Sequence, residues 1–449
     1  MGTQSRPVST SQLHFPLGKQ LAQQIFLQTL ATIDVRHAML AKLKWQGQVL
    51  QAGDIQLPLP RPPRVVAVGK AAFRMAAVLD EMLEGRIEGG VAVGPAEFVK
   101  KLPRFRYFVG GHPYPNAASF AAADAALNLV SGLTPDDAVI FLVSGGGSAL
   151  FEKPLDLAVS LEDFLEFNRV LVTCGLPIEQ INVLRKHVSA IKGGRLAVRA
   201  HPARQLTIYI SDVPDDLPSM IASGPTLPDG STAEEACTLA EQHHLAPKFP
   251  PRIRKCFDQH ALEETPKPGD EHFVNSSYFS LLSNRDAVES AKFAAEKLGF
   301  VCEIDGNMRD GDYQETAQAN LASLEALGKA HPHQPVCLVG GGEVTCPVTG
   351  PGIGGRNQAF VLFAASLLSG QKRVVLSAGT DGRDGNSPTS GAVADGQTVS
   401  RANALGLDPG KYLTDSDSYS FFRTLGDTLD IGFTDNNVRD VRIWFDFGS

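Results

Sequence analysis

Short apolar runs recur along the chain and are separated by segments with helical periodicity. The runs are continuous rather than alternating, as is typical of strands covered on both faces of a parallel sheet. Their positions are 65–68, 139–143, 206–210, 278–282, 336–339 and 374–376. Between them, 119–133 and 285–298 repeat apolar residues every three or four positions, which predicts amphipathic helices. Strands that alternate with helices predict an α/β fold.

The length and one atypical segment predict the domain organisation. A chain of 449 residues is long enough for two or three domains. Segment 241–272 is rich in proline and charge and interrupts the alternation of strands and helices. We interpret it as a domain linker, with a surface excursion as the alternative. The predicted domains therefore span 15–250 and 270–449.

Composition narrows the classes of function. The net charge of −8 argues against nucleic acid as a partner, because proteins that bind the phosphate backbone present a basic face. The six cysteines are scattered and form no CxxC pair, which favours reduced thiols over disulfides or a zinc site. No apolar run reaches the length of about 20 residues that crosses a bilayer, and the first residues do not form a signal peptide. We expect a soluble, cytoplasmic protein with no membrane partner.

Five of the apolar runs end in a polar or glycine-rich cluster. Ligands of open α/β sheets bind beyond the carboxyl ends of the strands, so the recurrence predicts a cleft that handles phosphate. Each cluster alone could be a tight turn. The clusters are 69–70, 144–148, 211–212, 340–343 and 379–382.

Two of these clusters carry groups suited to anionic oxygens. Ser144, Gly145, Gly146, Gly147 and Ser148 form a loop in which three glycines let a ligand approach the main chain, and successive amides can form an anion nest.

A lysine that directly follows a strand, as Lys70 does, can reach a phosphate as a point charge, although a lone lysine is more often solvated.

A basic cluster predicts a counter-charge for an acidic substrate. Its members are Arg185, Lys186, Lys192 and Arg195, and the alternative is a solvated helix face. Arg356 follows two glycines, which suits a guanidinium that binds a carboxylate or phosphate.

Carboxylates in the same clusters are candidate ligands of Mg²⁺. Magnesium takes one or two protein carboxylates, with phosphates and waters completing the shell. A carboxylate can also accept the proton of an attacking hydroxyl, or merely cap backbone amides in a turn. The candidates are Asp212, Glu343, Asp381 and Asp384, with Asp215 and Asp216 close to the first.

Several familiar motifs are missing. The segment 350–355 (GPGIGG) matches GxGxxG, but no long strand precedes it and no acidic residue follows at the spacing that would hold a ribose. Neither a Walker A loop nor the HRD and DFG motifs of protein kinases occur, and there is no GxSxG elbow of a hydrolase.

Longer blocks around these clusters resemble the glycerate 2-kinase family, the type that carries the MOFRL domain. The resemblance extends over nearly the whole chain, and each block is far longer than a generic motif. The blocks are VVAVGKAAFRMA (65–76), GGHPYPNAAS (110–119), LVSGGGSAL (142–150), NVLRKHVSAIKGGRLA (182–197), ISDVPDDLPSMIASGPT (210–226), GGGEVTCPVTGPGIGGRNQAF (340–360) and SAGTDGRDGNSPTSGAVAD (377–395).

The resemblance implies a larger Rossmann-like N-terminal domain and a smaller α/β C-terminal domain, with the active site in the cleft between them. It implies transfer of the γ-phosphate of ATP to the 2-hydroxyl of D-glycerate, assisted by Mg²⁺. Lys70, Asp212 and Arg356 are then the candidate catalytic residues. A hydroxypyruvate reductase that uses NAD(P)H and a non-catalytic sugar-acid binder are the alternatives, and a homodimer is left open.

Overall fold

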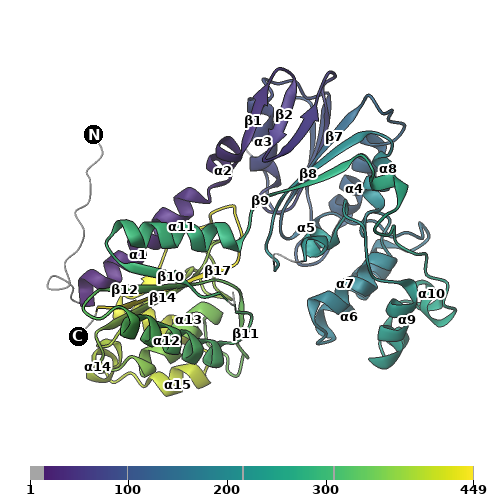
Figure 1. Cartoon of the computed structure of the whole chain (residues 1–449). Helices are drawn as coiled ribbons and strands as arrows, with labels where there is room; N and C mark the ends of the chain where they lie inside the picture. Colours follow the sequence, from purple (N-terminus) through teal and green to yellow (C-terminus); the bar gives the residue numbers. More distant parts are fainter. Residues whose placement is uncertain (1–14, 99, 215–216, 307–308, 448–449) are drawn as a thin grey trace. The chain divides into compact units, whose positions relative to one another are not determined.

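The computed structural model describes residues 15–98, 100–214, 217–306 and 309–447 (Figure 1). Contacts between residues divide the chain into two compact units. The central unit comprises 38–281. The terminal unit combines the first described residues, 15–37, with 282–447. Helix α2 (Val35–Lys42) spans the first boundary.

The central unit is built on a six-stranded sheet in which β4 to β8 are parallel. The spatial order is β6-β5-β4-β7-β8-β9, the order of a doubly wound sheet, and its direction reverses between β4 and β7. Almost every residue of β4 and β7 is buried, which explains why their apolar runs are continuous. The strands are β4 (Arg64–Val68), β5 (Gly89–Gly94), β6 (Phe105–Val109), β7 (Ala138–Val143), β8 (Arg204–Ile210) and β9 (Ser276–Leu282).

Helices and one small sheet complete the central unit. Helix α4 begins at a capping box, in which the Asn116 side chain accepts from the Ser119 amide. The helices are α3 (Ala72–Met82), α4 (Ala117–Leu129), α5 (Gly147–Leu150), α6 (Leu161–Thr173), α7 (Ile178–His187), α8 (Arg195–Ala200), α9 (Ala233–Gln242) and α10 (Pro251–Asp258), with 3₁₀ turns η2 (Pro218–Ser223), η3 (Ala246–Lys248) and η4 (Glu271–Phe273). An antiparallel sheet joins β1 (Leu43–Gln46), β2 (Val49–Ala52) and β3 (Ile55–Pro58).

The proline-rich segment 241–272 is part of the central unit, whereas the sequence favoured a linker there. Its helix α10 buries Ile253 and Phe257 in the apolar core shared by α6, α7 and α9. The Phe249 ring packs edge-on against Phe167, with centroids 4.9 Å apart. The chain passes to the terminal unit later, between residues 281 and 282.

The terminal unit has a mixed six-stranded sheet in the order β10-β12-β17-β14-β15-β16. The expected parallel arrangement is incorrect here, because β17 lies between β12 and β14 and is antiparallel to both. The carboxyl ends of β12 and β14 still lie at one edge, where β17 begins with Asp440. The strands are β10 (Val301–Ile304), β12 (Val336–Gly340), β14 (Arg373–Gly379), β15 (Gly391–Asp395), β16 (Thr428–Leu429) and β17 (Asp440–Asp446), and β11 (Gly311–Asp312) pairs separately with β13 (Val344–Thr345).

Helices cover both faces of this sheet (Figure 1). The core on the side of α12 and α13 contains Phe360 and Trp444, whose rings meet at a centroid distance of 5.8 Å. Helices α1 and α11 cover the other face. The helices are α1 (Phe15–Thr32), α11 (Asn284–Lys297), α12 (Tyr313–Ala330), α13 (Arg356–Leu367), α14 (Thr398–Ala404), α15 (Pro409–Thr414) and α16 (Ser418–Leu425).

Helix α1 packs on the terminal unit, whereas the sequence-based boundary placed it in the N-terminal domain. It buries Ile25 and Phe26 completely, and Lys19 forms ion pairs with Asp427 at 2.7 Å and Asp395 at 3.4 Å. Residues 15–37 and 282–447, which lie at opposite ends of the described chain, therefore contribute to one unit. In the described part of the chain, no helix combines the length and the apolarity needed to cross a membrane.

Candidate active site

Residues that follow β4, β7 and β8 meet at one edge of the central sheet. The amide of Lys70 donates to the Gly145 carbonyl at 2.9 Å, and the Ser144 hydroxyl accepts from the Ala71 amide at 3.0 Å. These bonds join the loop after β4 to the loop after β7. Since the strand order reverses between β4 and β7, the contact lies at the position where doubly wound sheets bind ligands.

Asp212 lies against the glycine loop from the next strand. A Cβ atom on Gly145 would be 2.0 Å from Asp212 Oδ2, so glycine is what allows the carboxylate to approach the main chain. Gly146 has a φ of 82°, and a Cβ there would be 3.4 Å from Lys70 Cγ and 3.4 Å from the His112 ring. Lys70, the loop and Asp212 therefore form one group, which we call the central cluster.

His112 lies beside the central cluster, and the sequence did not single it out as a site residue. Its pKa is lowered, first by partial burial of the ring and then by the charge of Lys70. A neutral imidazole can donate or accept a hydrogen bond at neutral pH. The Gly-His-Pro sequence before α4 was the available signal, but sequence alone did not place it beside Lys70.

Ser148 connects the loop to the basic segment through two buried polar residues. Its hydroxyl lies 2.8 Å from that of Ser223, which donates to Asn182 Oδ1 at 2.8 Å. The Arg185 guanidinium donates to the same oxygen at 3.2 Å. Arg185 is thus linked to the loop through Asn182 and Ser223. Burial lowers the pKa of Arg185, and the charge of Glu152 opposes that effect.

The other basic candidates are held by carboxylates elsewhere in the central unit. Lys186 pairs with Asp229 at 3.0 Å, and Lys192 with Glu152 at 3.1 Å, in each case with both partners buried. Arg195 pairs with Glu263 at 2.6 Å. The basic cluster of the sequence therefore does not form one anion-binding patch.

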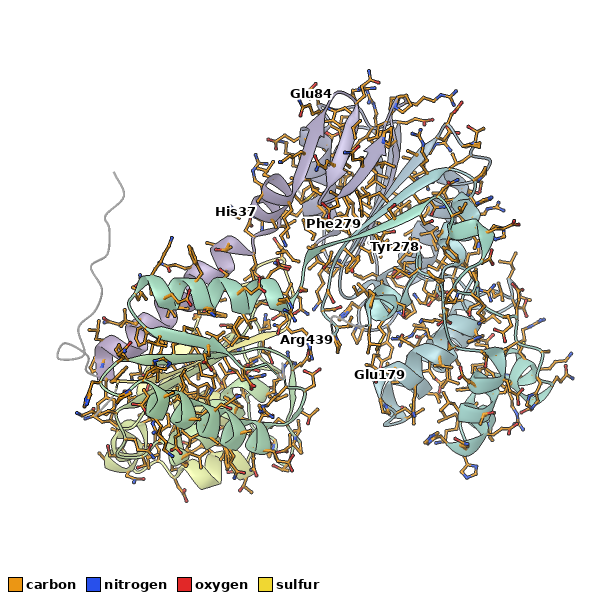
Figure 2. The ribbon with its side chains drawn as sticks, viewed as in Figure 1. His37, Glu84, Glu179, Tyr278, Phe279 and Arg439 are labelled. Atoms are coloured by element: carbon orange, nitrogen blue, oxygen red, sulfur yellow. The ribbon has the colours of Figure 1, made fainter. Side chains whose placement is uncertain are left out.

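In the terminal unit, Arg356 is the first residue of α13, and its guanidinium pairs with two carboxylates. Its Nε and Nη2 donate to the two oxygens of buried Asp440 at 2.6 and 2.9 Å, and Nη1 lies 2.7 Å from Glu343. Burial acts to raise the pKa of Asp440, but the Arg356 charge and hydrogen bonds lower it overall. Arg439, labelled in Figure 2, adds an ion pair with Asp310 and lies 3.9 Å from Glu343. Sequence reasoning also missed Asp440, because it lies in a strand that was not predicted.

The remaining carboxylates have structural contacts. Asp384 accepts from the amides of Asn357 at 3.0 Å and Gln358 at 2.8 Å and so caps α13, which removes it from the metal ligands that we propose. Asp381 is half-buried and accepts from the Arg383 amide at 3.0 Å. Asp215 and Asp216 lie outside the described residues. Within the described ranges, no three His, Cys, Asp or Glu side chains are grouped as they would be around a metal ion.

Two family models and several known proteins match the chain. The model of a domain of unknown function, DUF4147, matches residues 21–258, and the model of the MOFRL family matches 336–440. D-glycerate 2-kinase of Thermotoga maritima is 39% identical over 84% of this chain and 89% of that protein. Glycerate 2-kinase of Pyrococcus horikoshii is 34% identical over 84% and 86%.

A solved structure supports the same relationship. The crystal structure of glycerate kinase from Thermotoga maritima aligns with a TM-score of 0.83 and 35% identity, over 95% of this chain and 98% of that chain. Two matched family models, sequence relatives above 30% identity and a full-length structural match agree. The chain belongs to the glycerate 2-kinase family that carries the MOFRL domain.

Proposed function

We propose that this chain transfers the γ-phosphoryl group of ATP to the 2-hydroxyl of D-glycerate. The observation that supports the proposal most directly is the central cluster, which gathers a lysine, a glycine loop and a carboxylate where a doubly wound sheet binds ligands. The relatives carry the names of glycerate 2-kinases, and the chain spans most of their length. Phosphoryl transfer requires positioning and charge neutralisation more than covalent chemistry, and the cluster offers both.

Each residue has a defined task in this proposal. The hydroxyl oxygen of glycerate attacks the γ-phosphorus, the bond to the β,γ-bridging oxygen breaks, and ADP leaves. Asp212 accepts the hydroxyl proton. Lys70 stabilises the charge on the transferred group, and the amides of Ser144–Ser148 orient anionic oxygens. Arg356 is fixed by Asp440 and binds phosphate or the substrate carboxylate.

The donor set fits magnesium that is held largely by the nucleotide. Mg²⁺ keeps waters and phosphate oxygens as ligands and needs only one or two protein carboxylates. Asp212 is the first candidate to hold the ion, with Glu343 and Asp381 behind it. When bound, the ion would neutralise charge on the phosphates.

The reductase alternative has less support from the geometry. The 350–355 segment leads into α13 but follows the two-residue strand β13 after a loop, not the long strand of a dinucleotide-binding βα unit. Oxidation of NADH by the protein in the presence of hydroxypyruvate, without ATP, would restore that alternative.

Phosphorus NMR tests the proposal on the full chain, because each unit carries residues that we assign to the reaction. With D-glycerate, ATP and Mg²⁺, we expect a 2-phosphoglycerate resonance. Lys70→Ala should lower the rate by at least about 100-fold, since its charge acts mainly on the transition state. Lys248→Ala, at an exposed lysine of the same unit, is the control and should leave it unchanged.

Other outcomes would contradict specific parts of the proposal. A 3-phosphoglycerate product would keep the kinase and reject the position of transfer. Unchanged ATP with folded protein would reject the kinase. A protein that binds D-glycerate equally well as wild type and as Asp212→Asn, and leaves ATP intact in both forms, would be a sugar-acid binder.

A further inference from the structure

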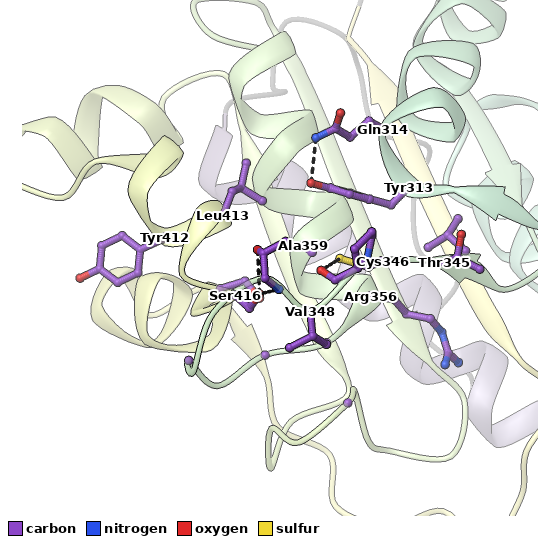
Figure 3. Close-up of a pocket in the computed structure, with 18 of the residues that line it drawn as sticks. Tyr313, Gln314, Thr345, Cys346, Val348, Arg356, Ala359, Tyr412, Leu413 and Ser416 are labelled. Carbon is purple, nitrogen blue, oxygen red and sulfur yellow. Dashed lines mark hydrogen bonds between the residues drawn. The ribbon is translucent and has the colours of Figure 1, made fainter. Parts of the chain in front are cut away.

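The terminal unit contains a cavity of about 750 Å³ beside Arg356, shown in Figure 3. Its walls come from four parts of the chain that are distant in sequence: the start of α12, the stretch 344–359 that includes β13 and the loop leading into α13, residues 385–386, and the 412–418 region. A three-carbon acid such as glycerate would fill only a small part of this volume. Cavities of this size hold ligands of roughly drug or nucleoside size.

The GPGIGG loop (350–355) forms one wall of the cavity, and hydrogen bonds hold its backbone in place. Gly352 donates to the Asp415 carbonyl at 2.9 Å, Ile353 to Asp417 Oδ1 at 3.1 Å, and Gly354 to Asn386 Oδ1 at 2.8 Å. A Cβ on Gly352 would be 2.4 Å from Asp417 Cβ, so the loop can press this closely only with glycine. The motif is therefore a pocket wall here, and binding needs little reordering of it.

The lining combines apolar faces with polar edges. Pro347, Val348 and Leu413 supply apolar surface, and Val348 is 85% exposed. Gln314, Asn386 and Ser416 contribute amides and a hydroxyl, while a hydrogen bond of 2.8 Å from Gln314 Nε2 to the Tyr313 hydroxyl fixes the Gln314 amide. A flat heterocycle with hydrogen-bonding edges, attached to a polyhydroxyl ring, matches this combination.

One end of the cavity carries the charges that a phosphate chain needs. Arg356 lines it, and Glu343 is paired with Arg356 at 2.7 Å. The first amides of α13 are already used by Asp384, so the helix end offers the guanidinium rather than free N–H groups. Adjacent positive and negative groups suit phosphates that are complexed with a divalent cation better than a bare polyanion.

We propose that this cavity binds the nucleoside of the phosphate donor, with the phosphates directed toward Arg356. The inference rests on the proposed kinase function and adds the location of the base and ribose. It assigns a role to the GPGIGG segment that does not depend on a dinucleotide-binding fold.

Calorimetric titration of the full chain with adenosine, Mg-ATP and D-glycerate tests the proposal. Thr345 lines the cavity and is exposed, so Thr345→Trp fills the space at little cost in folding. We expect adenosine and Mg-ATP to bind at least about tenfold more weakly, and D-glycerate to bind as before. The matched control is Thr424→Trp, at an exposed threonine of α16 outside the cavity, which should change neither.

Alkylation of Cys346 in the unmodified protein provides a second test that does not depend on a variant. Its thiol lines the cavity, and adenosine should slow its reaction with N-ethylmaleimide at alkaline pH. Cys256, a partly exposed thiol of the central unit, is the internal control and should react at the same rate with and without adenosine.

The experiments distinguish a failure of this inference from a failure of the proposed function. If wild type phosphorylates glycerate while Thr345→Trp keeps full adenosine affinity and adenosine does not protect Cys346, the kinase stands and the nucleoside site is elsewhere. If adenosine binds and both tests succeed but no phosphate is transferred, the cavity assignment stands and the kinase proposal falls. A wild-type protein that binds no nucleotide overturns both.

Discussion

At the scale of single residues, the orientation of Arg356 depends on a carboxylate that never reaches solvent. Asp440 is fully buried and accepts two hydrogen bonds from the guanidinium, whereas the Glu343 side chain, on the other side, is 40% exposed. Removing one partner of a buried pair leaves an uncompensated charge, and removing an exposed partner leaves a solvated one. The two carboxylates should therefore differ greatly in their contribution.

We predict that Asp440→Asn lowers the free energy of unfolding by about 3–5 kcal/mol, because it leaves Arg356 without its buried counter-charge. Glu343→Gln should lower the free energy of unfolding by less than about 1 kcal/mol. Urea denaturation at constant pH measures both. Equal losses for the two variants would show that burial does not distinguish them.

The raised pKa of Asp384 predicts that the stability of the protein depends on pH. Burial raises its pKa to about 7, with the Asp440 charge acting in the same direction and the amides of Asn357 and Gln358 opposing. Because the pKa is higher in the folded state, the folded protein keeps the proton on Asp384 at pH values at which the unfolded chain has already lost it. The stabilisation is complete below the unfolded pKa of about 3.9 and disappears as the pH rises through about 7, with a slope of at most about 1.4 kcal/mol per pH unit.

The Asp384→Asn variant isolates this contribution. The stability of wild type minus that of the variant should fall between about pH 4 and about pH 7 and then level off. Urea denaturation of both proteins over this range provides the comparison. A difference that does not vary with pH would show that Asp384 keeps its ordinary pKa.

At the scale of elements, the sequence was most informative where buried parallel strands carry the site. Lys70, the glycine loop and Asp212 each follow such a strand, and carboxyl ends of parallel strands share an edge, so their proximity followed from the pattern. Strand β17 escaped prediction because its sequence DVRIWFD places charged residues between apolar ones, as in a half-exposed strand. Asp440 and Arg442 are nevertheless buried. Each offsets part of the other's charge, Arg356 pairs with Asp440, and the charges of Asp305 and Asp310 favour ionised Arg442; sequence spacing cannot reveal these partners from other elements.

The basic cluster of Arg185, Lys186, Lys192 and Arg195 shows the same limit of prediction from sequence. Four cations within eleven residues suggested one anion site, yet Lys186, Lys192 and Arg195 each pair with a carboxylate distant in sequence. Charge spacing along a helix cannot identify partners that the fold supplies from elsewhere.

The glycine loop gives a prediction at the element scale. Gly145→Ala introduces a Cβ that would be 2.0 Å from Asp212 Oδ2, so the carboxylate must move away from the central cluster. We expect the rate of glycerate phosphorylation to fall by at least about 100-fold. Gly230→Ala is the control, since nothing lies within 4 Å of its Cβ position and its φ is not positive, and it should retain full activity. Full activity of Gly145→Ala would show that the position of Asp212 is not critical.

At the scale of the whole molecule, the chain returns to the unit in which it starts. Helix α1 packs against α11 and β14 of the terminal unit, although some 240 residues of the central unit intervene in sequence. Amphipathicity shows that a helix has an apolar face but not which sheet covers it, so the sequence alone could not assign residues 15–37 to the terminal unit. The stability of the terminal unit should accordingly depend on the first helix of the chain.

Two neighbouring residues of α1 test this dependence, since Phe26 is fully buried and Leu27 is 52% exposed. Phe26→Ala should destabilise the terminal unit by about 3–5 kcal/mol, because it leaves a cavity in that core, and Leu27→Ala should cost no more than about 0.5 kcal/mol. Hydrogen exchange followed by mass spectrometry locates the effect: amides of α11 and β14 should exchange faster in Phe26→Ala, while those of β4 and β7 keep their rates. Faster exchange in β4 and β7 instead would mean that α1 stabilises the central unit, and the division of the chain would have to be redrawn.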